Sequence, residues 1–198
     1  MRIMTTALLA SVGAALLAGA GPAMARDATG IEVEAAAATL APNRYVWNDT
    51  ATDMPVSVVI NIGEQRAYVY RGEQLVAATS VSTGKGGKET PSGTFTILQK
   101  AVDHRSNIYD AAPMPYMQRL TWDGVAIHAG RNPGFPASHG CIRVPTEFAK
   151  KLFAVTTVGT QVTVVGEDGL VAPTPPAIPN TADETADANK AVLDTPAR

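Results

Sequence analysis

The sequence lacks several features that mark common classes of protein. Of its 198 residues only Cys141 is a cysteine, so an internal disulfide framework is excluded. Charged residues make up 17% of the chain and the net charge is −2, with no basic stripe and no run of interleaved aromatic residues. These absences exclude a nucleic-acid partner and give no support for binding to a membrane surface. No cofactor-binding motif is present, and we expect the protein to work without a cofactor.

The first residues carry a pattern typical of an export signal. Arg2 is followed by an apolar stretch from about residue 7 to 20, and small residues flank Met24. This pattern predicts a signal peptide over residues 1–25 and a location in the periplasm or cell envelope. The alternative is a transmembrane anchor, but the apolar stretch is shorter than the ~20 residues that a span needs and breaks at Gly21-Pro22. No cysteine lies near the cleavage box, which excludes lipid attachment through a cysteine.

Composition divides the rest of the chain into three parts. Residues 26–54 are rich in Ala and Thr, and we expect a linker or a loosely attached N-terminal arm with one short helix near residues 31–40. Residues 55–166 are long enough for one domain with its own core, and we expect it to be monomeric. The tail over residues 167–198 combines several prolines with Ala, Thr and acidic residues, a composition that predicts disorder.

The central part is dominated by strand patterns. Alternating and β-branched runs separated by tight turns predict about seven short strands. One helix is expected after Pro145, with Phe148, Leu152 and Phe153 on its apolar face. The fold class is therefore mainly β, a β-sandwich or partly open barrel with one main helix. The expected strands cover residues 56–62, 67–70, 74–82, 94–99, 116–122, 125–128 and 161–165.

Cys141 stands in the run Pro136-Ala137-Ser138-His139-Gly140-Cys141-Ile142-Arg143. A free cysteine is often a small buried hydrophobe. Gly140 and Arg143 argue against an interior strand, because glycine permits a sharp turn and arginine prefers a wet or paired position. A thiol at such a turn is a candidate nucleophile. Its own backbone N–H and that of Gly140 or His139 would then face a developing oxyanion.

His128 is the candidate base. It ends an apolar run thirteen positions before Cys141, and the loop over residues 129–138 can return the chain beside it. An imidazole near the thiol would lower the thiol pKa from about 8.5 and hold a reactive thiolate. No acidic residue lies between His128 and Cys141, so a backbone carbonyl would have to orient the imidazole, most simply that of Ala129.

Other polar residues near the cysteine have more than one interpretation. His139 is two residues from Cys141, and alternation on an extended segment puts both side chains on one side. There His139 would line the oxyanion region or contact substrate, and service as the base is the second choice. Arg143 is either a clamp for a substrate carboxylate or half of a structural salt bridge. His104 lies in a polar run and is expected on a surface loop. A zinc centre of His128, His139 and Cys141 is disfavoured, because no carboxylate lies nearby and no CxxC pair exists, so we expect no metal.

Two blocks of the sequence resemble a known family. His128 together with Ser138-His139-Gly140-Cys141 is similar to the His…[Ser/Thr]-His-Gly-Cys signature of the L,D-transpeptidases with a YkuD-type catalytic domain. Ser82-Thr83-Gly84, followed by Thr90-Pro91-Ser92-Gly93-Thr94-Phe95, is similar to the glycine-rich turn and TP-x-G-x-F segment of that family. The resemblance covers about residues 55–166. The chain departs from the family pattern in the nine-residue spacing between His128 and Ser138 and in having Arg143 where others have asparagine, and both departures bear on substrate preference.

The resemblance implies a YkuD-like β-sandwich of mixed sheets and a cysteine acyltransferase of peptidoglycan. Cys141 would form a thioester with a tetrapeptide stem and release D-alanine, with His128 as base and then acid. An amine of a neighbouring stem would take the acyl group and give a 3-3 cross-link. The implied residues are Cys141, His128, His139 and Gly140 as catalytic groups, and Arg143, Ser138, Gly130 and Ala129 on the substrate side.

The sequence does not distinguish between a stem amine, water and a protein lysine as the acyl acceptor. Water would make the protein an L,D-carboxypeptidase, and a lysine of an outer-membrane protein would make it an anchoring enzyme. A different class of function is a catalytically silent module that binds the envelope. The expected partners are peptidoglycan stem peptides and, for an anchoring enzyme, an envelope protein.

Overall fold

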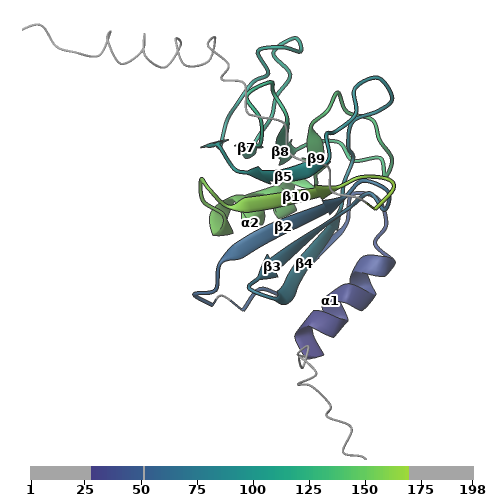
Figure 1. Ribbon diagram of the computed structural model, residues 1–198, viewed down its shortest axis with the longest axis vertical. Coiled ribbons are helices and arrows are strands. Elements are labelled where there is room, and N and C mark those ends of the chain that lie inside the picture. The colour runs from purple at the N-terminus through teal and green to yellow at the C-terminus, as the bar shows by residue number, and fades with distance from the viewer. Residues whose placement is uncertain (1–27, 51, 170–198) are drawn as a thin grey trace, which may run out of the picture.

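The computed structural model describes residues 28–50 and 52–169, so the predicted signal peptide and nearly all of the predicted tail lie outside the described residues. Two β-sheets dominate the fold (Figure 1), which confirms the prediction of a mainly β protein. No helix within the described ranges is long and apolar enough to cross a membrane. The six-stranded sheet contains, in spatial order, β1 (Tyr45–Trp47), β4 (Gln74–Ser80), β3 (Arg66–Arg71), β2 (Val56–Asn61), β10 (Gln161–Val165) and β5 (Gly93–Thr96).

Alternation along the strands of this sheet separates a core face from an outer face. In β2 the buried side chains are Val58 and Ile60, and in β3 they are Ala67 and Val69, so each strand buries every second residue. β2, β3 and β4 form the predicted antiparallel meander, while β10 pairs with β2 in parallel. The sheet is therefore mixed, as expected.

The second sheet has four strands and carries the candidate site. The predicted strand over residues 94–99 divides between the two sheets, since β5 ends at Thr96 and the chain crosses over before it resumes at Gln99. The strand over 142–144 was not predicted, because three residues between a turn and a helix are too short for a periodic pattern. The strands are, in order, β6 (Gln99–Ala101), β7 (Met117–Arg119), β8 (Ala126–Ala129) and β9 (Ile142–Val144).

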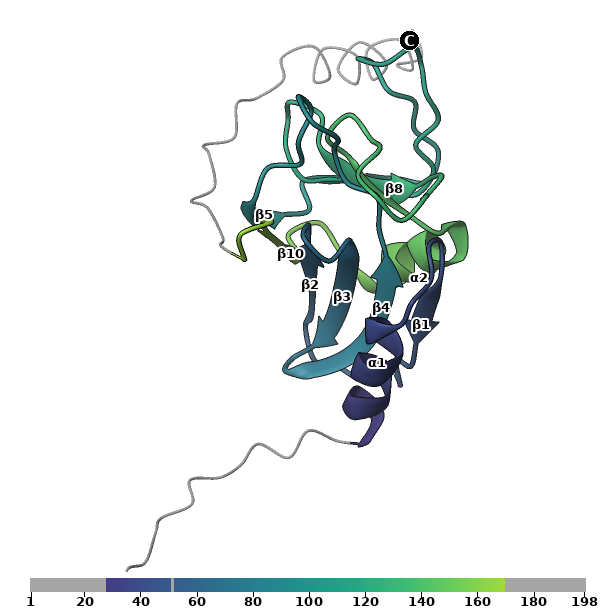
Figure 2. The ribbon, with the colours of Figure 1, turned by 90° about the vertical axis from the view of Figure 1, so that its right-hand side faces the viewer.

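The helix that follows the cysteine segment is α2 (Thr146–Val155), which begins after Pro145 as predicted. Phe148 on α2 is fully buried, and its ring centroid lies 5.9 Å from that of Tyr45 and 5.5 Å from that of Trp47. Leu152 is also buried, whereas Phe153 is half-buried against Tyr116. α2 thus closes the core on the side of β1 (Figure 2).

The N-terminal arm is packed on the body of the protein, which differs from the expected loose attachment. It forms α1 (Ala28–Ala38), which lies against β4 (Figure 2), and the edge strand β1. Val33 and Ala37 are buried against Ala78 of β4. Together with Tyr45 and Trp47 of β1, whose rings pack on Phe148, these few apolar residues attach the arm to the core.

The segment around Ser82 holds the cysteine-bearing segment by backbone pairing. Ser82 and Arg143 exchange two backbone hydrogen bonds, each 3.0 Å from nitrogen to oxygen. The carbonyl of Thr83 accepts bonds from the N–H groups of Ala137 and Ser138, also at 3.0 Å. The stretch over residues 137–143 is therefore fixed by residues 82 and 83 on one side and by β8 on the other.

Gly84 and Thr90 extend this support to the turn before the cysteine. The N–H of Gly84 donates to the Thr90 hydroxyl at 2.8 Å, and that hydroxyl donates to the carbonyl of Gly140 at 2.8 Å. A Cβ atom at Gly84 would lie 2.0 Å from the carbonyl oxygen of Lys88. Only glycine fits at this position, because the contact is with backbone that cannot swing away.

We expect Gly84→Ala to lower the free energy of unfolding by about 2–3 kcal/mol, since the added methyl group forces the backbone apart. Gly86→Ala is the matched control, because a Cβ there meets nothing within 4 Å. Urea unfolding of both variants measures the difference. Equal stabilities would show that the close approach at Gly84 relaxes without cost.

Candidate active site

A cavity of about 690 Å³ is lined by residues of β7, β8 and β9 and by the loops around them. It contains Cys141 and all three histidines of the chain, His104, His128 and His139. His104 lies on a loop, as expected, and is half-buried at the edge of the cavity. The loop forms a hairpin in which the N–H of Met114 donates to the carbonyl of His104 at 2.8 Å. Further backbone bonds from the N–H of Tyr116 to Val102 and from that of Ser106 to Ala112 close the same hairpin. Residues 102–116 carry no alternating pattern from which this hairpin could be predicted.

Cys141 lies immediately before β9 and is held at a tight turn. The Ser138 hydroxyl donates to the Cys141 carbonyl at 2.5 Å and accepts the N–H of Gly140 at 3.1 Å. Gly140 has φ of 115°, a conformation that glycine adopts readily. The thiol donates to the carbonyl of Gly124 at 3.4 Å. Ser138 is buried at the cavity wall, with its hydroxyl engaged by the turn itself.

His128 is oriented by its own neighbour in β8. Its Nδ1 lies 2.9 Å from the carbonyl oxygen of Ala129, the contact that the sequence suggested. Nδ1 therefore carries the hydrogen, which leaves the lone pair of Nε2 as the basic site. In the parallel pairing of β8 with β9, His128 lies opposite Arg143, two residues beyond Cys141. Side chains two residues apart share a face, so the three groups meet in one cavity.

Burial has the largest effect on the pKa of the Cys141 thiol. It raises the pKa of Cys141 above its ordinary value of 9.0, against the opposing influence of the Ala126 backbone and of Arg143 and Arg119. The neighbouring imidazole predicts a lowered thiol pKa and a resting thiolate. The structure differs because loss of hydration outweighs the nearby positive charges.

The pKa of the His128 imidazole is shifted in the opposite direction. Burial lowers the pKa of His128 below its ordinary 6.5, the hydrogen bond to Ala129 opposes this, and Arg143 and His104 lower it further. Only 7% of the His128 surface is exposed. At neutral pH the pair therefore rests as a neutral thiol and a neutral imidazole.

His139 and Tyr109 form the outer wall of the cavity. The two rings are stacked, with centroids 4.8 Å apart and planes 28° from parallel. The His139 side chain is exposed, in contrast to His128. Tyr109 belongs to the same loop as His104, and neither was singled out by the sequence as a site residue.

Gly130 and Arg143 pack closely beside the imidazole. A Cβ atom at Gly130 would lie 3.2 Å from the Arg143 Cγ and 3.4 Å from the His128 Cε1. The absence of a side chain at Gly130 thus lets the stem of Arg143 lie against His128. Arg119, a second arginine of the cavity, is buried and donates to the Gln99 side chain at 2.8 Å. Within the described ranges, no group of three His, Cys, Asp or Glu side chains could hold a metal ion.

Comparison with known proteins gives several matches to one family. Residues 55–164 match the model of the L,D-transpeptidase catalytic domain, YkuD. The chain is 30% identical over 124 residues to L,D-transpeptidase 1 of Mycobacterium tuberculosis, covering 54% of this chain and 49% of that protein. It is 26% identical over 150 residues to the probable L,D-transpeptidase ErfK/SrfK of Salmonella typhimurium, covering 63% and 48%. The chain spans about half the length of these relatives.

Solved structures share the fold. An L,D-transpeptidase from Stackebrandtia nassauensis has a TM-score of 0.52 and 25% identity, over 58% of this chain and 57% of that chain. The transpeptidase LdtMt1 in complex with imipenem has a TM-score of 0.52 and 26% identity, over 56% and 58%. The fold is thus YkuD-like, and the matched region contains Cys141 and His128. Because the family model covers more than half of the chain, the protein belongs to the L,D-transpeptidase family of cysteine-dependent enzymes, with a YkuD catalytic domain.

Proposed function

We propose that the protein is a peptidoglycan L,D-transpeptidase that transfers a tetrapeptide stem through a thioester on Cys141. The observation that supports this most directly is the shared cavity of Cys141 and His128, with the His128 Nδ1 fixed 2.9 Å from the Ala129 carbonyl. A thiol beside an oriented imidazole is the arrangement that nucleophilic acyl transfer requires. The matches to transpeptidases over residues 55–164 favour this chemistry over hydrolysis of other esters or amides.

In the first step the thiol attacks the carbonyl of the third stem residue. Nε2 of His128 takes the thiol proton as the S–C bond forms, which suits a pair that rests neutral. The tetrahedral oxyanion needs donors, and the Gly140 N–H already donates to Ser138. The N–H groups of His139 and Cys141 are therefore the proposed oxyanion donors.

In the second step the tetrahedral intermediate collapses. His128 returns its proton to the leaving nitrogen, the C–N bond breaks and D-alanine departs, leaving the thioester. An amine of a second stem then attacks, His128 accepts its proton, and the S–C bond breaks to restore the thiol with a 3-3 cross-link formed. Arg143 is the proposed partner for a stem carboxylate, and Gly130 and Ala129 form the adjacent wall.

The acceptor separates the transpeptidase from related activities. Attack by water would give a carboxypeptidase, and attack by a protein lysine would give an anchoring enzyme. Purified protein incubated with tetrapeptide muropeptides and analysed by mass spectrometry should give cross-linked dimers. Tripeptides alone would identify the carboxypeptidase.

Cys141→Ser should abolish all products, because a hydroxyl is a far weaker nucleophile than a thiol.

A catalytically silent module is tested on the same preparation. Because a transpeptidase that resembles this chain has been solved in complex with imipenem, we propose imipenem as a probe of the thiol. Intact-mass analysis should show one adduct, which is lost in Cys141→Ser. Absence of both adduct and muropeptide products would contradict the proposed enzyme.

The two histidines near Cys141 should differ in their effect on turnover. His128→Ala should reduce turnover by about 10²–10⁴-fold, because it removes the base. His139→Ala should reduce it by about tenfold or less, the cost of one hydrogen bond or ring contact. Steady-state kinetics of the two variants measures the difference. The reverse order would mean that His139 is the base.

The pKa shifts predict the pH dependence of thiol reactivity. Alkylation of Cys141 by iodoacetamide should rise with pH to a midpoint above 9.0, since burial raises the thiol pKa. Arg143→Gln should move the midpoint higher, because Arg143 lowers that pKa. The acid limb of kcat/KM should lie below pH 6.5, since protonation of His128 removes the base and burial lowers its pKa. An alkylation rate that reaches its plateau below pH 8 would indicate a resting thiolate.

A further inference from the structure

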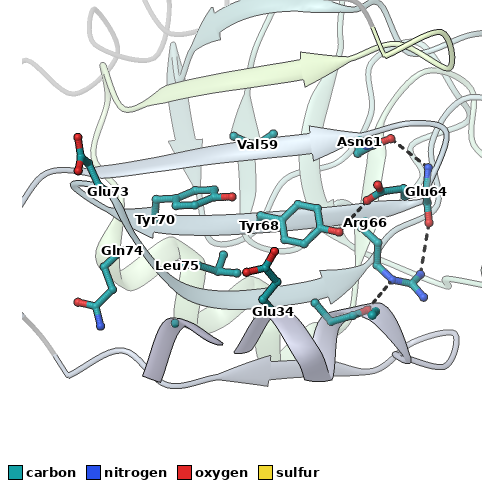
Figure 3. A pocket seen from close by; sticks show the side chains of 13 residues that line it. Glu34, Val59, Asn61, Glu64, Arg66, Tyr68, Tyr70, Glu73, Gln74 and Leu75 are labelled. Atoms are coloured by element: carbon teal, nitrogen blue, oxygen red, sulfur yellow. Dashed lines mark hydrogen bonds between the residues drawn. The ribbon is translucent and has the colours of Figure 1, made fainter. Parts of the chain in front are cut away.

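A second groove, of about 830 Å³, lies on the outer face of the six-stranded sheet (Figure 3). Its floor is formed by Tyr68 and Tyr70, which point to the same side of β3 because they are two residues apart. Val59 of β2 and Leu75 of β4 border the two rings. The groove shares no lining residue with the cavity of Cys141.

One wall of the groove is α1, and it is fixed in place. Arg66 of β3 donates to the carbonyl of Ala37 at 3.2 Å and to that of Leu40 at 2.6 Å. These carbonyls lie at the C-terminal end of the helix, where a positive charge is stabilising. The guanidinium of Arg66 is thus directed at the helix end, and Glu34 of α1 points into the groove (Figure 3).

The charge of the groove is predominantly negative. Three exposed glutamates line it, Glu34, Glu64 and Glu73, against the single basic side chain of Arg66. Glu64 accepts the Tyr68 hydroxyl at 2.7 Å at one end of β3, and Glu73 lies past the other end. The six residues of β3 span roughly 20 Å, the length of a short extended peptide.

We propose that this groove binds an extended, lysine- or arginine-rich peptide segment of a partner protein. Carboxylates at both ends attract cationic side chains. Tyrosine rings between them accept an ammonium or guanidinium group on their faces. Peptide binding in this groove does not depend on the reaction at Cys141, so an experiment can contradict either proposal without contradicting the other.

The negative charge of the groove argues against three other ligands: the chain's own tail, a second copy of the protein and a peptidoglycan stem. The chain's own tail begins nearby, since the carbonyl of Glu167 is 3.4 Å from a Cβ position at Gly63, in the turn beside Glu64. Residues 170–198, however, contain four acidic side chains and only two basic ones, so the glutamates of the groove would repel them. A second copy of the protein would bring the same acidic face, and peptidoglycan stems carry carboxylates.

Fluorescence anisotropy with fluorescein-labelled hexalysine and the full chain tests the proposal. Hexalysine should bind at low salt, and its affinity should fall strongly toward 1 M salt, where the Debye length is about 3 Å. Labelled hexaglutamate should not bind. No binding of hexalysine, or binding that salt does not change, would overturn the proposal.

Variants place the binding in the groove. The double change Glu64→Gln and Glu73→Gln should lower the affinity for hexalysine by about tenfold at low salt. Tyr70→Leu should lower this affinity by about threefold. Glu32→Gln is the matched control, because Glu32 is an exposed carboxylate of α1 outside the groove. Thermal unfolding checks that each variant is folded. Equal weakening by the control and the double variant would overturn the proposal.

Two further outcomes would assign the groove to a different occupant. An N-acetylglucosamine oligomer that displaces hexalysine from the groove would identify a saccharide site. Size-exclusion chromatography that shows a dimer, dissociated by the double variant, would identify a self-association face. Either result contradicts the basic-peptide proposal.

Discussion

The candidate site depends on the backbone pairing between residues 82–84 and residues 137–143. Cys141 and Arg143 follow a turn that has no regular structure of its own, and this turn is fixed from outside by Ser82, Thr83 and Thr90. The supporting segment lies more than fifty residues earlier in the chain. The position of Cys141 therefore depends on contacts with the first half of the chain, and the hydroxyl of Thr90 links the tightly packed Gly84 to Gly140.

A second constraint is the removal of the thiol and imidazole from water. Burial acts on the two groups in opposite directions, and both shifts favour the uncharged form. Arg119 and Arg143 partly offset this for the thiol without reversing it. In the proposed mechanism the proton therefore moves during attack on the substrate, and the orientation of His128 by Ala129 matters more than a stored negative charge.

Much of this arrangement could be predicted from local patterns. The meander and α2 follow from alternation and turn residues, and a short motif predicts that Cys141 and His128 lie together with the imidazole on the Ala129 carbonyl. All of these signals are local. Three features could not be predicted, because they depend on tertiary contacts. The arm packs through a few scattered apolar side chains, among them Val33 and Trp47. β9 is recognisable only beside β8, and His104 reaches the cavity on a hairpin closed by several backbone hydrogen bonds.

The raised pKa of Cys141 also bears on how readily this thiol is oxidised. Peroxides and disulfides react with a thiolate far faster than with a thiol, so low-pKa cysteines are the ones most readily oxidised. A half-buried thiol with a raised pKa is less reactive toward such oxidants than a thiolate would be. The desolvation that makes Cys141 need a base in the proposed mechanism thus also protects the thiol from oxidation, and the chain has no second cysteine that could resolve an oxidised one.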